Sequence, residues 1–174
     1  MSIYPKISKW RVPSALLHES LSEMSIDGAK GNEGISLWLG IRDEERQIAT
    51  VSHAVRLRGP GIRKMPAQIQ IQPELMREVH ETARGLEKIL IGQIHSHGTA
   101  YGVKLSYVDI TYGISVPFYL SVVAPHYALK PETKWDDCGS HVYVPKKGYV
   151  LIASREIITV DNSLPLEVLT VGNA

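Results

Sequence analysis

Two segments of the chain carry large apolar residues at the spacing of one helical face. The first is residues 14–24, which follow a proline and place Leu17, Leu21 and Met24 on one stripe. The second is residues 73–88, which open on a proline and repeat Leu75, Val79, Thr82 and Leu86 at helical spacing. This spacing predicts two amphipathic helices.

Shorter apolar or alternating runs, bounded by turn residues, predict strands. They cover residues 35–41, 47–57, 68–72, 116–124, 141–145 and 148–154, and the run KILIGQI before His95 adds another. The turn PKKG links the last two as a hairpin, while RLRGPGIRKMP (56–66) is expected to be a flexible loop. The mixed order predicts one α/β (α+β) domain over residues 1–174, a sandwich with a central mixed, largely antiparallel sheet flanked by helices.

The composition fits one globular domain and argues against several classes of partner. Of 174 residues, 44% are apolar and 21% are charged, which suffices for a sizeable core. The 19 basic and 18 acidic side chains nearly cancel, so no overall field directs the chain to nucleic acid or to an anionic membrane. No run is long enough to cross a bilayer.

The compartment is inferred from the cysteine content and the first residues. Cys138 is the sole cysteine, so an intramolecular disulfide cannot form. The opening residues MSIYPKISKW lack the apolar stretch of a secretory signal. A reducing cytoplasm is therefore the expected location.

The most informative local pattern is a pair of histidines, separated by one residue, at the end of an apolar run. His95 and His97 in IGQIHSHG project from the same face of the predicted strand and can hold one metal ion together. Asp109 follows fourteen residues after His95, and a turn could bring its carboxylate back to complete a His₂Asp set. Three protein ligands with one position left for water are typical of catalytic zinc sites. The pattern therefore favours a hydrolase.

A second interpretation of the same segment is structural. Ser106 and Asp109 in SYVD fit the S-x-x-D pattern of a capping box, in which both side chains only satisfy free backbone N–H groups. Both interpretations place the two residues at the start of a helix through YVDITYG. They differ in whether Asp109 faces the histidines.

The segment from His95 to Asp109 resembles the signature of the JAB/MPN family in its catalytic JAMM form. That signature is H-[ST]-H-P, seven residues, S, two residues, D. The family's upstream glutamate is matched in EGISLWLG, with Glu33 at the front. KWRVPSALLHESLSEM is similar to the family's first strand and helix, and VPFYLSVVAP to the strand after its metal-site helix. Gly98 replaces the family's proline, which is expected to loosen the loop that leaves the strand. The implied fold is similar to that of cytidine deaminases.

The resemblance implies a role for each site residue. His95, His97 and Asp109 would bind Zn²⁺. Glu33 would take a proton from water and deliver it to the leaving amine, and the Ser106 hydroxyl would donate a hydrogen bond to the oxyanion. Ser96 is expected to support the strand by hydrogen bonding.

Non-haem iron oxygenases also use two histidines and a carboxylate. Their sites usually have the order H-x-[DE] followed by a distant histidine, whereas H-x-H comes first here. Oxygen activation also requires neither the glutamate nor the serine. The spacing therefore favours zinc hydrolysis.

The resemblance also implies a substrate. Catalytic JAMM proteins mostly cleave amide or isopeptide bonds after the C-terminal glycine of ubiquitin-like modifiers, and small stand-alone members resemble bacterial peptidases encoded with ubiquitin-like conjugation systems, including antiphage ones. The expected partners are a ubiquitin-like protein, its conjugates, and E1-like and E2-like enzymes of the same operon. Three alternatives remain: release of sulfur or an amino acid from a carrier protein, a RadC-like relative, and a non-catalytic MPN scaffold.

Other residues with chemical potential receive simpler interpretations. His53 shares a strand face with apolar residues, which predicts a hydrogen-bonded core histidine. Cys138 has no neighbouring activating group and is not expected to be a nucleophile. The segment 56–66 gathers four basic side chains, which are expected to be solvated, or to grip an acidic partner if they flank the site: Arg56, Arg58, Arg63 and Lys64.

Overall fold

The structure is a computed structural model that describes residues 5–173. Its helices are α1 (Leu16–Gly28), α2 (Pro73–Gly85), α3 (Tyr107–Tyr112) and α4 (Ser154–Ile157), with short 3-10 turns at Thr99–Tyr101, His126–Ala128 and Trp135–Asp137. The strands are β1 (Lys9–Pro13), β2 (Ile35–Asp43), β3 (Ile48–Leu57), β4 (Ile62–Met65), β5 (Gln68–Ile71), β6 (Ile89–Ser96), β7 (Leu120–Ala124), β8 (Gly139–Val144), β9 (Gly148–Ile152), β10 (Ile158–Asp161) and β11 (Glu167–Val171). In this part of the chain, no helix combines the length and apolar character needed to span a membrane.

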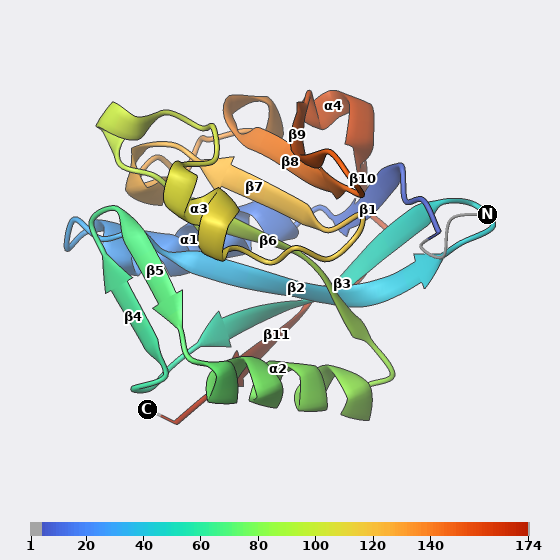
Figure 1. The fold of residues 1–174 in the computed structure, drawn as a ribbon, viewed down its shortest axis with the longest axis horizontal. Helices are drawn as coiled ribbons and strands as arrows, with labels where there is room; N and C mark the ends of the chain where they lie inside the picture. The colour runs from blue at the N-terminus through green and yellow to red at the C-terminus, as the bar shows by residue number, and fades with distance from the viewer. Residues whose placement is uncertain (1–4, 174) are drawn as a thin grey trace.

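Nine strands form one curled sheet, and β4 and β5 form a separate hairpin (Figure 1). The sheet order is β10-β1-β3-β2-β6-β7-β8-β9, and β11 also pairs with β3. Four strand pairs are parallel and four are antiparallel. The predicted α/β (α+β) class is confirmed, but the sheet is evenly mixed rather than largely antiparallel.

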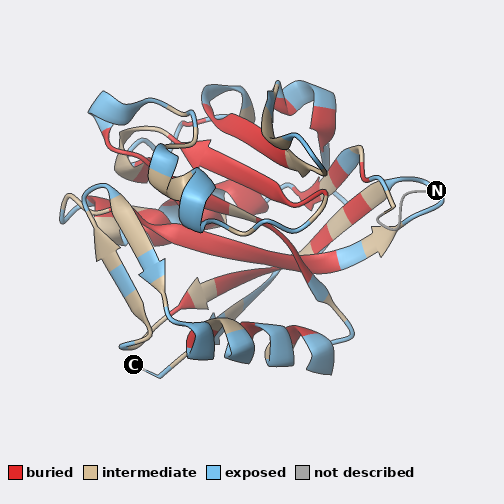
Figure 2. Cartoon of the chain, in the orientation of Figure 1, coloured by how far each residue is buried: buried red, intermediate tan, exposed pale blue. Residues whose placement is uncertain are grey.

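Strand β2 lies at the centre of the sheet because it is apolar on both faces. Trp38 packs into the cluster that contains α1, and its indole N–H donates to Ser20 Oγ of that helix at 3.2 Å. Leu37 and Leu39 point to the opposite face, into the cluster beneath α2. The two helices therefore cover opposite faces of the sheet, and the buried residues concentrate in the strands between them (Figure 2).

The elements predicted from apolar spacing are present with shifted ends. Helix α1 begins two residues later and ends four residues later than expected, and α2 ends three residues earlier. The prediction of a loop over segment 56–66 is wrong in part: residues 59–61 form a turn, but Ile62–Met65 forms β4, which pairs with β5. Strands β10 and β11 were also not predicted.

His53 on β3 is a core residue, as its position predicts. Its side chain is buried, with Nδ1 at 2.7 Å from Ser52 Oγ and Nε2 at 3.2 Å from Glu167 Oε2 of β11. Both ring nitrogens therefore have partners outside any metal site.

Candidate metal centre

His95 lies near the end of β6, where this strand is enclosed between β2 and β7, and His97 directly follows the strand. Their residues are 3% and 2% exposed. The one-residue spacing directs both rings to the same side of the strand, and their Nε2 atoms are 3.1 Å apart. A neutral imidazole leaves one of its two ring nitrogens unprotonated, so each ring can offer a lone pair to a metal ion at this point.

Asp109 reaches the same point from α3. The capping box is formed, because Ser106 Oγ accepts the Asp109 N–H at 3.1 Å and Asp109 Oδ2 accepts the Ser106 N–H at 2.7 Å. The same carboxylate faces the histidines, with Oδ2 at 3.1 Å from His97 Nε2 and Oδ1 at 3.4 Å from His95 Nε2. The structural and metal-binding interpretations are therefore compatible: the cap fixes the carboxylate that faces the rings.

The three donor groups lie close enough together to share one metal ion. The His95 and His97 Nε2 atoms are 3.1 Å apart, and each faces a different oxygen of Asp109, with Oδ2 at 3.1 Å from His97 and Oδ1 at 3.4 Å from His95. Ligand atoms around a tetrahedral zinc lie about 3.3 Å from one another. His97 Nδ1 lies 3.1 Å from the Gly102 carbonyl. A proton on Nδ1 makes that hydrogen bond and leaves Nε2 free to bind a metal. His95, His97 and Asp109 could therefore hold a metal ion.

Without a metal ion, this cluster favours an ionised aspartate beside a protonated histidine. Burial opposes ionisation of Asp109, but hydrogen bonds from His95 and His97 hold its pKa well below the usual range. Burial would also lower the pKa of His97, yet the hydrogen bond to Asp109 raises it overall. Metal must displace this proton, so metal affinity is expected to fall as pH falls.

Glu33 lies at the entry to β2 and is 3% exposed. Its N–H donates to Met65 O of β4 at 2.9 Å. The following Gly34 N–H donates to Ser96 Oγ, between the two histidines, at 2.9 Å, so Ser96 provides the expected support. Burial, opposed by His97 and reinforced by Asp109, raises the pKa of Glu33 to about 7. A carboxyl group with a pKa near neutrality is suited to accept and return a proton.

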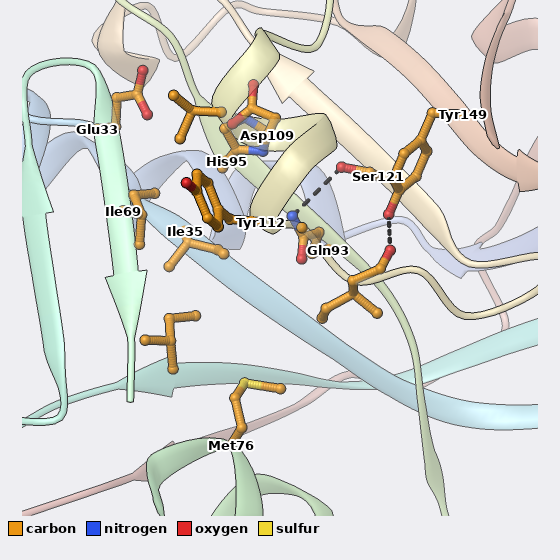
Figure 3. Close-up of a pocket in the computed structure, with 14 residues that line it drawn as sticks. Glu33, Ile35, Ile69, Met76, Gln93, His95, Asp109, Tyr112, Ser121 and Tyr149 are labelled. Carbon is orange, nitrogen blue, oxygen red and sulfur yellow. Dashed lines mark hydrogen bonds and ion pairs between the residues drawn. The ribbon is translucent and has the colours of Figure 1, made fainter. Parts of the chain in front are cut away.

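A cavity of about 160 Å³ adjoins the cluster, and Glu33, His95 and Asp109 line it (Figure 3). Much of its remaining wall is aliphatic and comes from four regions, β2, β5, α2 and the α3 segment: Ile35, Ile69, Ile71, Met76, Val108 and Ile114. The site thus combines acid–base and metal-binding groups with an apolar wall.

The polar part of this cavity was not predicted from the sequence. Gln93 lies on β6 two residues before His95, and its Nε2 is 3.5 Å from Ser121 Oγ (Figure 3). The buried Tyr119 hydroxyl donates to Gln93 Oε1 at 3.1 Å and so fixes the orientation of the amide. Strand alternation from His95 could have identified Gln93, whereas Ser121 and Tyr119 come from another strand region.

Ser106 is outside the residues that line the cavity, and its Oγ accepts a hydrogen bond in the cap. The hydroxyl proton remains available for donation. Ser106→Ala is expected to lower the free energy of unfolding by about 1 kcal/mol through loss of the cap. If the hydroxyl also stabilises the oxyanion, turnover at saturating zinc should fall about a hundredfold, while Ser106→Thr should retain both properties. Unchanged turnover with the stability loss would limit Ser106 to capping.

The basic segment does not form a free cationic surface. Three of its four side chains pair with carboxylates of α1: Arg56 with Glu19 at 3.1 Å, Arg58 with Glu23 at 3.0 Å and Lys64 with Asp27 at 2.7 Å. Arg63 is exposed, as expected, whereas the other three side chains are used within the fold. Their charges attach β3 and β4 to α1 instead.

Arg58→Ala is expected to destabilise the fold because Glu23 is only 3% exposed and would lose its bidentate partner. We expect a loss of about 2 kcal/mol, less than for a fully buried pair, since Arg56 remains 3.4 Å from Glu23. Urea denaturation provides the measurement, and Arg63→Ala, which alters an exposed residue of the same segment, is the control. Equal effects of the two substitutions would contradict this assignment.

Two single-residue expectations are also resolved. Gly98 has φ −64°, a value that proline also adopts, so unusual backbone torsion does not explain this glycine. Cys138 is buried, and burial, reinforced by Asp137, raises its pKa to about 12. Burial therefore disfavours the thiolate form that a nucleophilic cysteine needs.

Comparison with known proteins gives a relative of the fold but no family. No family model matches the chain, and no curated protein matches it. The chain is similar to the solution structure of protein DSY2949 from Desulfitobacterium hafniense, with a TM-score of 0.65 and 18% identity over 89% of this chain and 94% of that one. At this identity the similarity concerns the fold alone.

Proposed function

We propose that the protein is a zinc hydrolase of the JAB/MPN type in its JAMM form, with a cytidine-deaminase-like fold. The observation that carries the proposal is the convergence of His95, His97 and Asp109, two of which line one cavity together with Glu33. The order of these elements along the chain supports it. A glutamate precedes a central strand, two histidines end the neighbouring strand, and the Ser-x-x-Asp helix follows.

The donor set fits zinc, for which imidazole nitrogens and carboxylate oxygens are common ligands. When bound, zinc lowers the pKa of water and polarises a carbonyl group. Glu33, with its pKa near neutrality, takes the proton from the attacking water and delivers it to the leaving amine. The Ser106 hydroxyl donates a hydrogen bond to the developing oxyanion.

We propose the extended C-terminal tail of a ubiquitin-like protein as the substrate, cleaved after its last residue. The aliphatic wall of the cavity suits such a tail, whose main chain can add to a strand edge. Helix α3 also carries large exposed side chains near Asp109: Tyr107, Ile110 and Tyr112 are 80%, 54% and 79% exposed. Tyrosines and large apolar residues on a surface are typical of protein interfaces.

The experiment presents the zinc-loaded protein with ubiquitin-like proteins from its own genome, each carrying a C-terminal cargo through a peptide or a lysine isopeptide bond. We expect release of the cargo after a C-terminal glycine or another small residue, while casein stays intact. Ready digestion of casein, or indifference to every ubiquitin-like fusion, would overturn the substrate assignment. Sulfur or amino-acid release from a carrier protein, or a scaffold role, would then be the alternatives.

A further inference from the structure

A strained turn lies next to the proposed catalytic centre. His126, Tyr127 and Ala128 have φ values of 56°, 54° and 57°, a left-handed conformation that is unfavourable for residues other than glycine. The Tyr127 N–H donates to His97 O at 2.7 Å, and Ala128 is 2% exposed. Strained backbone persists where its surroundings fix it, and it concentrates at functional sites.

Two glycines make room for Tyr127. A Cβ at Gly28, at the end of α1, would lie 2.1 Å from the Tyr127 carbonyl oxygen. A Cβ at Gly98, directly after His97, would lie 2.7 Å from both Cζ and Oη of the Tyr127 ring. Because φ at Gly98 suits proline, the tyrosine ring is what excludes a side chain there.

The Tyr127 ring connects the exit of the metal strand to the tip of the β4–β5 hairpin. Its hydroxyl donates to Pro66 O at 3.0 Å. The preceding residue, Met65, accepts the Glu33 N–H through its carbonyl at 2.9 Å. Lys64, one residue earlier, has its Nζ at 2.7 Å from Asp27 Oδ2, and both of these side chains are less than one-fifth exposed. Three successive residues at the tip are therefore anchored separately.

We propose that Tyr127 is a positioning residue that latches the β4–β5 hairpin and thereby places Glu33 relative to the two histidines. The inference rests on the proposed function for its catalytic consequence, but the latch itself is a property of the fold. The hairpin also supplies Ile69 and Ile71 to the cavity. The contact between Tyr127 and Pro66 thus holds both Glu33 and part of the apolar wall of the cavity in place. Gly98 is required because a side chain there would displace the Tyr127 ring.

The test compares Tyr127→Phe, which removes only the hydroxyl, with Gly98→Ala, which pushes the ring away. Hydrogen exchange of the Glu33 amide reports directly on its bond to Met65 without requiring activity. Both variants should accelerate this exchange about threefold to tenfold, the range that one hydrogen bond commonly supplies. The double variant should show no further increase, since both changes release the same contact.

Activity provides the second readout. Both variants should retain full zinc content, lower kcat by about threefold to tenfold, and move the acidic limb of the pH–rate profile to lower pH, because a less buried Glu33 ionises more readily. Tyr101→Phe is the control, since among the described residues the Tyr101 hydroxyl has no hydrogen-bond partner, and it should leave every readout unchanged.

Unchanged Glu33 exchange in Tyr127→Phe and Gly98→Ala would overturn the latch. Additive effects in the double variant would also overturn it, because two independent perturbations would then be present. Accelerated exchange in a protein that cleaves no amide bond would retain the latch and reject the proposed function. The two failures are therefore distinguishable.

Discussion

Replacing His95, His97 or Asp109 by alanine is expected to abolish hydrolysis and to reduce zinc from about one ion per chain to a small fraction. Each substitution removes one of the three donor groups whose atoms converge. The loss should be measured by metal analysis after dialysis against a weak chelator, together with cargo release. His80→Ala is a matched control, because this histidine is exposed on α2, and it should retain both zinc and activity.

Asp109→Ala has an additional consequence. It removes half of the capping box, so the free energy of unfolding should fall by about 1 kcal/mol even in metal-free protein. Full zinc retention in all three alanine variants would show that the ligands are elsewhere.

Glu33→Gln is expected to separate metal binding from catalysis. Glutamine keeps the shape of the side chain but cannot accept the proton, so the variant should bind zinc and substrate yet hydrolyse at least about a hundredfold more slowly. Single-turnover kinetics at saturating zinc would measure this. Turnover within about twofold of the unsubstituted protein would remove Glu33 from the mechanism.

Glu33→Gln is also expected to change how the free energy of unfolding depends on pH. The pKa of Glu33 is raised from 4.5 to about 7 by burial, so folding favours its neutral form. The contribution of the neutral Glu33 carboxyl to the free energy of unfolding is complete below pH about 4. It is lost as pH rises through about 7, where this carboxyl ionises in the folded protein. Metal-free Glu33→Gln should therefore gain on the order of 2 kcal/mol relative to the unsubstituted protein between pH 5 and 8. Zinc should shrink this difference, because a nearby cation favours the ionised carboxylate.

Local patterns predicted the elements that carry the site, but not the contacts between them. Apolar spacing gave both long helices and the strands β2 and β6, and the histidine spacing correctly placed two rings on one face. The S-x-x-D pattern predicted a cap and a ligand equally well, and the fold satisfies both with one carboxylate.

The errors concern long-range partners. Strand β11 pairs in parallel with β3 across more than a hundred residues, and a short run gives no local indication of such pairing. Arg58 pairs with Glu23 of α1, so its charge is neutralised by a residue 35 positions away. Gly98 was interpreted through its own flexibility, whereas the structure explains it by the Tyr127 ring.

X-ray absorption at the zinc edge of the zinc-loaded protein tests the central claim most directly. The proposed metal centre predicts only nitrogen and oxygen ligands at about 2.0–2.1 Å, with the signature of two imidazoles, and this signature should be lost in His95→Ala together with most of the zinc. A sulfur ligand at about 2.3 Å, which only Cys138 or a methionine could supply, an unchanged imidazole signature in His95→Ala, or failure of the protein to take up zinc would contradict it.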